Sequence, residues 1–129
     1  MNDEIKRYKR SKINCRQYRE NNVGGDVIWR YKDPTEILKE AVDQLHLKTT
    51  DGYLIDGKDP IYIGPRYKND IAPLPDKIGN FGVTVTWQKS YLGDGGGWPG
   101  SKKYEYLAIL RVEGTNQTAK KAFQVIYVP

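Results

Sequence analysis

The residues best suited to chemistry in this chain are the cations and tyrosines of its first 22 residues. That segment holds seven Lys and Arg against three Asp and Glu, a net charge of +4 out of +5 for the whole chain. Lys and Arg neutralise phosphates and carboxylates, and tyrosine rings stack on unpaired bases. We therefore predict a partner-binding arm formed by Lys6, Arg7, Tyr8, Lys9, Arg10, Lys12, Arg16, Tyr18 and Arg19.

Three interpretations of this basic arm stay open. The arm can bind an acidic surface of a neighbouring protein subunit, bind nucleic acid, or serve as a solvated tail. The rest of the chain is close to neutral, so the charge belongs to the arm and not to the body. The partners that we predict are neighbouring subunits of a homo- or hetero-oligomer, with nucleic acid as the alternative and no membrane.

A glycine-rich stretch at residues 93–102 invites comparison with a phosphate-binding loop. Such a loop ends in Gly-Lys-Ser/Thr and leads into a helix whose N–H groups face the phosphate. Here the order is Gly-Ser-Lys and a strand is expected to follow, which argues against nucleotide binding. The stretch carries one large side chain, Trp98, followed by Pro99. We predict that Trp98 either docks on a partner from a hairpin tip or covers its own sheet.

Groups for catalysis are scarce. His46 is the single histidine, Cys15 is the single cysteine, and three serines occur without a nucleophile-elbow sequence. One histidine without a cysteine pair does not form the usual zinc site. Turn formation explains the five aspartates of the middle segment, Asp51, Asp56, Asp59, Asp70 and Asp76. We expect no enzyme activity, no cofactor and no metal.

The sequence also bears on location. The first residues, Met-Asn-Asp-Glu, lack the pattern of a secretory signal peptide. No run approaches the ~20 apolar residues that cross a bilayer. A single cysteine excludes an intrachain disulfide, which fits a reducing compartment. We expect a virion or cytoplasmic location, without secretion by a signal peptide.

The clearest helical signals in the sequence begin at residue 33. Asp33 suits an N-cap, Pro34 the first helical position and Glu36 the third residue after the cap. Apolar residues then recur at helical spacing, which predicts an amphipathic helix over residues 34–47. Before it, residues 27–31 indicate a short strand or an extended lead-in.

The middle of the chain is rich in turns. Residues 53–55 and 61–63 are apolar runs separated by Asp, Gly and Pro, and they predict a short hairpin with its loop at 56–60. Residues 65–80 indicate an irregular surface loop. At this length the loop favours a binding role.

The last third indicates β-structure. Apolar and polar residues alternate over residues 81–91, and residues 104–112 and 122–128 are apolar on both faces. We predict an α+β fold, a small mainly antiparallel sheet made of a three-strand C-terminal meander plus the short hairpin, packed by one amphipathic helix. The domains expected are the basic N-terminal arm, 1–22, and a single α+β domain, 23–129.

These observations favour a binding protein over an enzyme. Ten tyrosines and three tryptophans suit half-buried surfaces and interfaces. Our leading hypothesis is a non-enzymatic structural subunit of a larger assembly, of the virion or phage-particle type, that docks through its basic arm and long loops. The alternative is a nucleic-acid-binding module, associated with ribonucleoprotein, that uses the tyrosine-containing arm.

Overall fold

The computed structural model describes residues 17–21, 27–31 and 33–129. Residues 17–21 form β1 (Gln17–Asn21), which contains Tyr18 and Arg19 and pairs antiparallel with β2 (Val27–Tyr31). The sequence left a choice between a strand and an extended lead-in for residues 27–31, and the structure shows a strand. The other predicted arm residues lie outside the described residues: Lys6, Arg7, Tyr8, Lys9, Arg10, Lys12 and Arg16.

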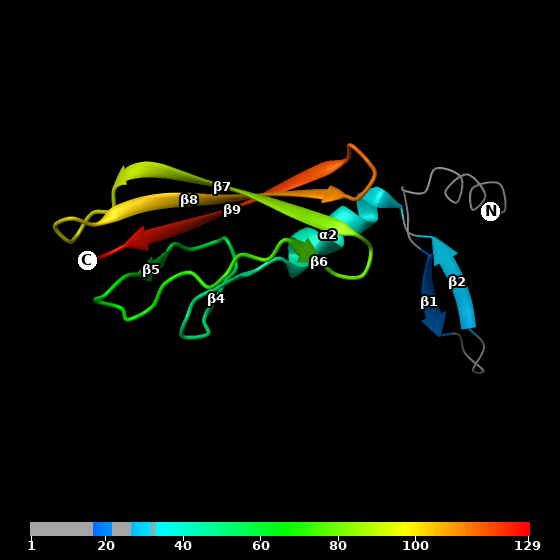
Figure 1. The fold of residues 1–129 in the computed structure, drawn as a ribbon, viewed down its shortest axis with the longest axis horizontal. Helices are drawn as coiled ribbons and strands as arrows, with labels where there is room; N and C mark the ends of the chain where they lie inside the picture. Colours follow the sequence, from blue (N-terminus) through cyan, green and yellow to red (C-terminus); the bar gives the residue numbers. More distant parts are fainter. Residues whose placement is uncertain (1–16, 22–26, 32) are drawn as a thin grey trace.

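A five-stranded sheet forms the body, in the order β5-β9-β8-β7-β6 (Figure 1). Its centre is the predicted meander, in which β7 (Val83–Asp94), β8 (Lys102–Val112) and β9 (Thr118–Tyr127) pair antiparallel in turn. Its edges are two short strands, β5 (Ile61–Ile63) and β6 (Lys77–Ile78). The predicted α+β fold with a mainly antiparallel sheet is therefore confirmed for the described residues.

The core lies on one face of this sheet. Along β8, Ala108, Leu110 and Val112 are fully buried, whereas the alternating residues Leu107 and Ile109 point to the other face and stay partly exposed. β8 has β7 on one side and β9 on the other, which confirms the central position predicted from its apolar character.

Helix α2 (Pro34–Gln44) covers part of the core face and begins as predicted (Figure 1). The Asp33 side chain accepts a hydrogen bond of 2.9 Å from the Thr35 amide, and Ile37 lies buried against the sheet. The helix ends three residues earlier than predicted. From Leu45 to Thr49 buried and exposed residues alternate. Every second residue can face the core only in an extended chain, so the helix ends before this segment.

Lys121 of β9 supplies a positive charge at the C-terminal end of α2. Its Nζ donates to the carbonyl oxygens of Val42 at 3.1 Å and Leu45 at 2.6 Å, and the last turn of the helix has no basic residue of its own. Burial lowers the pKa of Lys121, while the charges of Asp56 and Asp43 act in the opposite direction. The side chain thus joins the helix to the sheet.

The predicted hairpin of residues 53–55 and 61–63 is wrong. β4 (Leu54–Ile55) pairs antiparallel with β3 (Leu47–Lys48), and β5 pairs parallel with β9, where Ile63 lies opposite Tyr127. Residues 56–60 still form a turn, in which the Asp56 carboxylate accepts a 2.9 Å hydrogen bond from the Lys58 amide. The local turn signal was interpreted correctly, but β4 pairs with the segment just before it, and the partner of β5 is distant in sequence.

Residues 65–80 are largely irregular, as predicted, with three points of pairing. Asn69 bridges to Gly64, Ile71 bridges to Thr49, and Lys77–Ile78 form β6 against the start of β7. Gly64 packs directly on the backbone, since a Cβ built there would lie 2.2 Å from the carbonyl oxygen of Val128. These contacts hold the loop against the sheet edge.

Candidate partner-binding site

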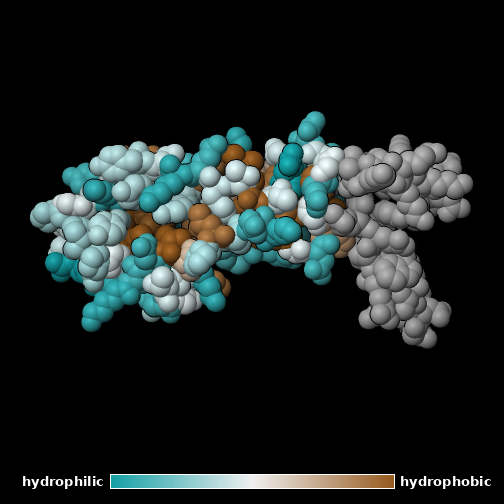
Figure 2. All heavy atoms as spheres, in the orientation of Figure 1, coloured by the Kyte–Doolittle hydropathy of each residue, from teal (hydrophilic) through white to brown (hydrophobic). Residues whose placement is uncertain are grey.

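Large aromatic side chains are exposed toward the end of the sheet where β7 turns into β8. The exposed fraction is 64% for Tyr53 and 40% for each of Tyr62, Tyr67 and Trp98. Elsewhere on the face shown in Figure 2 the surface is largely hydrophilic or intermediate in hydropathy, with hydrophobic residues in patches over the middle of the molecule. A group of half-exposed aromatic rings is typical of a binding surface.

Trp98 lies in the loop between β7 and β8. The Ser101 amide donates to the Trp98 carbonyl at 3.1 Å, and the Gly95 amide donates to the Ser101 carbonyl at 3.2 Å, so the loop has a defined shape. The guanidinium carbon of Arg66 lies 4.0 Å from the centre of the Trp98 ring. Trp98 therefore has one contact with the segment after β5 and keeps part of its ring exposed.

Three tyrosines border a cleft of about 430 Å³ beside β5, which we call the tyrosine cleft. Two of them stack, because the ring centres of Tyr62 and Tyr67 lie 5.5 Å apart with an angle of 29° between planes. The cleft is lined by Asp51, Tyr53, Pro60, Ile61, Tyr62, Tyr67 and Asn69.

Local structure explains how the tyrosines come to face the cleft. In β5, Ile63 is buried and Tyr62 points away from the core, as alternation in a strand requires. The next turn closes with a 2.8 Å hydrogen bond from the Gly64 amide to the Asn69 carbonyl, and Lys68 has a φ of 55°. This turn brings Tyr67 back over Tyr62.

Asp51 supplies the charge of the cleft. Its carboxylate accepts hydrogen bonds from the Thr49 hydroxyl, from the Tyr53 amide at 3.5 Å and from the Asn69 side-chain amide at 3.4 Å. These donors, the Thr49 hydroxyl first, lower the pKa of Asp51 below its ordinary value of 3.8. Asp51 is therefore an anion at neutral pH, held beside tyrosine rings.

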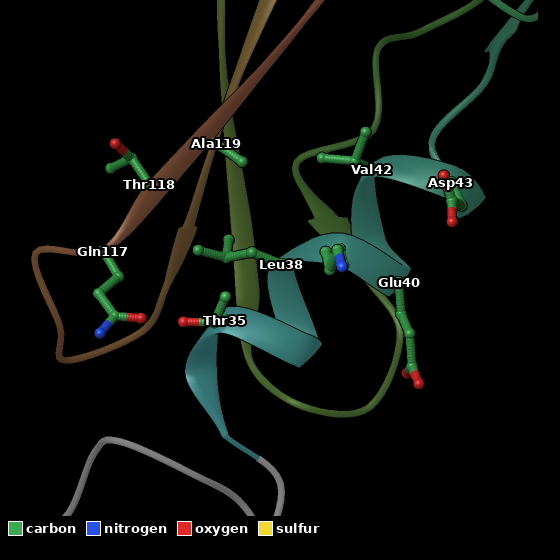
Figure 3. Close-up of a pocket in the computed structure, with 9 residues that line it drawn as sticks. Thr35, Leu38, Glu40, Val42, Asp43, Gln117, Thr118 and Ala119 are labelled. Carbon is green, nitrogen blue, oxygen red and sulfur yellow. The ribbon is translucent and has the colours of Figure 1, made fainter.

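A second cleft, of about 730 Å³, lies between α2 and the start of β9. Figure 3 shows Leu38 reaching from the helix toward Ala119, with polar side chains around them. The floor is thus apolar and the rim is polar, which suits a small apolar group of a partner. Its lining comprises Thr35, Leu38, Lys39, Glu40, Val42, Asp43, Gln117, Thr118 and Ala119.

Among the residues that the structure describes, no three His, Cys, Asp or Glu side chains are grouped so as to hold a metal ion. His46 is exposed just after α2. Within the same part of the chain, no helix has the length and apolar character to cross a membrane. Comparisons with protein-family models, with curated proteins and with solved structures found no match to this chain.

The sequence reasoning named Trp98 but missed the tyrosine cleft. Tyr62 stands between two isoleucines of a strand, and alternation alone could have placed it on the outside. Tyr53 and Tyr67 carried no such signal, because their positions depend on turns and on the pairing of β5 with β9. Asp51 was assigned to turn formation, and its hydrogen bonds to Thr49 and Tyr53 fit that role.

Proposed function

We propose that this protein is a non-enzymatic interaction subunit of a larger assembly. The observation that carries the proposal is the exposure of five large aromatic side chains toward one end of the body: Tyr53, Tyr62, Tyr67, Tyr91 and Trp98. Aromatic residues lose little conformational entropy on binding and bury a large area each. Their collection at one end is more than the scattered exposure that any protein surface shows.

The residue types match those that dominate binding energies. Tyr, Trp and Arg are enriched among the residues whose truncation weakens protein complexes most, and here Arg66 lies over the Trp98 ring at 4.0 Å. Half-exposed rings of this kind become fully buried when a partner covers them. The tyrosine cleft next to this pair supplies a concave surface for a partner's side chain.

The assembly type that we propose is a virus or phage particle. A basic arm on a nearly neutral body supports it, because such an arm binds an acidic neighbouring subunit or packaged nucleic acid. In this proposal the aromatic end of the body makes protein contacts while the arm extends to the next component.

Light scattering of the protein isolated with its native complex tests this proposal. We expect a complex larger than the monomer, and we expect Tyr62→Ser together with Tyr67→Ser to weaken it. Asn116→Ser is the control, since Asn116 is exposed in the turn between β8 and β9, at the other end of the sheet. A strictly monomeric protein that co-purifies with nothing would refute the proposal.

Nucleic-acid binding remains the alternative and predicts a different result. Stacked tyrosines can hold unpaired bases, and phosphate contacts make binding strongly dependent on salt. Tight, salt-sensitive binding of single-stranded oligonucleotides, lost when the arm cations are replaced by Gln, would favour this alternative over a protein assembly.

A further inference from the structure

The tyrosine cleft differs from the other aromatic groups of the described chain in one respect. Trp98 and one ring of each of the other two ring pairs have a cation: Arg66 lies 4.0 Å from the Trp98 ring centre, Lys89 lies 4.4 Å from that of Tyr104, and Lys121 lies 5.3 Å from that of Phe123. Among the residues that the structure describes, no cation lies over Tyr53, Tyr62 or Tyr67.

The cleft nevertheless has the features of a cation site. The faces of aromatic rings attract ammonium and guanidinium groups, and several rings together form cages for such ligands. Asp51 adds an ionised carboxylate to the lining. Asn69 also lines the cleft, and its side-chain amide donates to the Asp51 carboxylate at 3.4 Å, which holds the carboxylate in place beside the rings.

Selectivity for a cation must come from these close contacts. Residues 49–70 carry four aspartates and three cations, so the net field around the cleft is weak. The ring faces and the Asp51 carboxylate act only within a few ångströms. The ligand is therefore a cation that enters the cleft, such as the side chain of arginine or lysine on an extended peptide.

We propose that the tyrosine cleft binds arginine or lysine side chains of the basic N-terminal segment, residues 1–16, of a neighbouring copy of this chain. The inference rests on the proposed function, and it names the partner for that aromatic end. The segment is the strongest concentration of cations in the sequence, and it includes Lys6, Arg7, Lys9, Arg10, Lys12 and Arg16.

A neighbouring copy is the donor that the proposed assembly requires, and the segment is long enough to bridge two copies, since 16 extended residues span up to about 50 Å and could equally reach the cleft of their own chain. Gln17 pairs with Tyr31, so the arm starts near the beginning of α2, and α2 shares a cleft with Gln117 at the turn between β8 and β9. The tyrosine cleft is near the opposite end of the sheet, because β5 pairs with residues 125–127 of β9. Strand rise puts these two ends on the order of 30 Å apart, and Figure 1 shows α2 and β5 toward opposite ends of the molecule.

An arm at one end and a receiving cleft at the other give a head-to-tail contact. Such contacts are heterologous, and they build rings when the rotation closes and filaments when it does not. A chain with this arrangement adds copies without needing a second type of subunit. We therefore expect the purified protein to self-associate as its concentration rises.

Sedimentation velocity of the full-length protein, with a synthetic peptide of residues 1–22 as competitor, tests the inference. We expect concentration-dependent association that the peptide inhibits and that a peptide with Gln in place of every Lys and Arg does not. Tyr62→Leu together with Tyr67→Leu, or Asp51→Asn alone, should weaken association about tenfold. Asn116→Ser, in the exposed turn at the other end of the sheet, should leave it unchanged, and circular dichroism verifies that each variant is folded.

Three results would overturn the inference. The first is a protein that stays monomeric at every concentration. If this monomer becomes less compact when Tyr62 and Tyr67 are replaced, the cleft binds the arm of its own chain and not that of a neighbour. The second is association that ignores both the cleft variants and the peptide. The third is loss of oligonucleotide binding, without loss of peptide binding, in the cleft variants. If the native complex still depends on Tyr62 and Tyr67 in any of these cases, the proposed function stands while the arm is excluded as the partner.

Discussion

Replacing Gly64 by Ala should separate the edge strand β5 from the rest of the sheet. Gly64 has a φ of 116°, which side chains other than glycine rarely adopt, and its added Cβ would lie 2.2 Å from the Val128 carbonyl oxygen. The neighbouring hydrogen bond, 2.8 Å from the Val128 amide to the Ile63 carbonyl, leaves little room for the backbone to move. The variant must therefore adopt a strained backbone and also lose contacts between β5 and β9.

The size of the effect follows from two parts. The backbone conformation alone costs about 1–2 kcal/mol for alanine. The backbone overlap adds the loss of a hydrogen bond and of edge packing, about 1–2 kcal/mol more. We expect the free energy of unfolding to fall by about 3 kcal/mol, measured by urea denaturation followed by far-UV circular dichroism.

Gly52→Ala is the matched control. Gly52 has a φ of 99°, and nothing lies within 4 Å of a Cβ built there. The control variant should therefore lose only the conformational part, about 1–2 kcal/mol. If Gly64→Ala destabilises the protein no more than Gly52→Ala does, the close approach of Gly64 to Val128 does not affect the free energy of unfolding. Our reasoning about β5 is then wrong.

Three further predictions concern single side chains. Lys121→Met should lower the free energy of unfolding by about 1–2 kcal/mol in thermal melts, because the Leu45 carbonyl loses its lysine donor and the Val42 carbonyl keeps only the Leu45 amide. In the wild type, the lowered pKa of Lys121 makes stability rise with pH from that pKa toward 10.5, and the Met variant should lack this rise. Asp33→Ala should cost about 1 kcal/mol in the same assay through the lost cap on the Thr35 amide. The pKa of Asp51 is lowered by folding, so its carboxylate adds stability that is present above the ordinary value of 3.8 and is lost as the pH falls through the folded-state pKa. Asp51→Asn should therefore flatten the acid-unfolding curve in that pH range. An unchanged curve would contradict the hydrogen bonding of Asp51.

The sequence predicted those elements whose signals are local. The N-cap at Asp33 and the alternation along β7 required only neighbouring residues to interpret. The end of α2 was placed too late because Leu45 fits helical spacing as well as the two-residue alternation that the structure adopts from Leu45 onward. Both choices bury apolar residues, and only the position of the sheet decides between them.

Local sequence signals could not predict which distant strands pair. The partner of Ile61–Ile63 is a strand about sixty residues later, and its pairing is parallel, which no turn signal between them could indicate. The tyrosine cleft depends on that pairing and on the turn after Gly64, so the sequence could suggest that Tyr62 is exposed but not that Tyr67 covers it. Trp98 was expected at a hairpin tip, where the structure has it, but its contact with Arg66 was not foreseen.

The parallel pairing of β5 with β9 also sets an order of events during synthesis. Residues 61–63 leave the ribosome long before residues 125–128, and they have no strand to join until those residues have emerged. A nascent or prematurely terminated chain could form the hairpin of β7 and β8 but could not hold Tyr62 in its final position. Tyr62 therefore takes its final position only after residues 125–127 have been made, so under the proposed function a chain that stops before them would not form the tyrosine cleft.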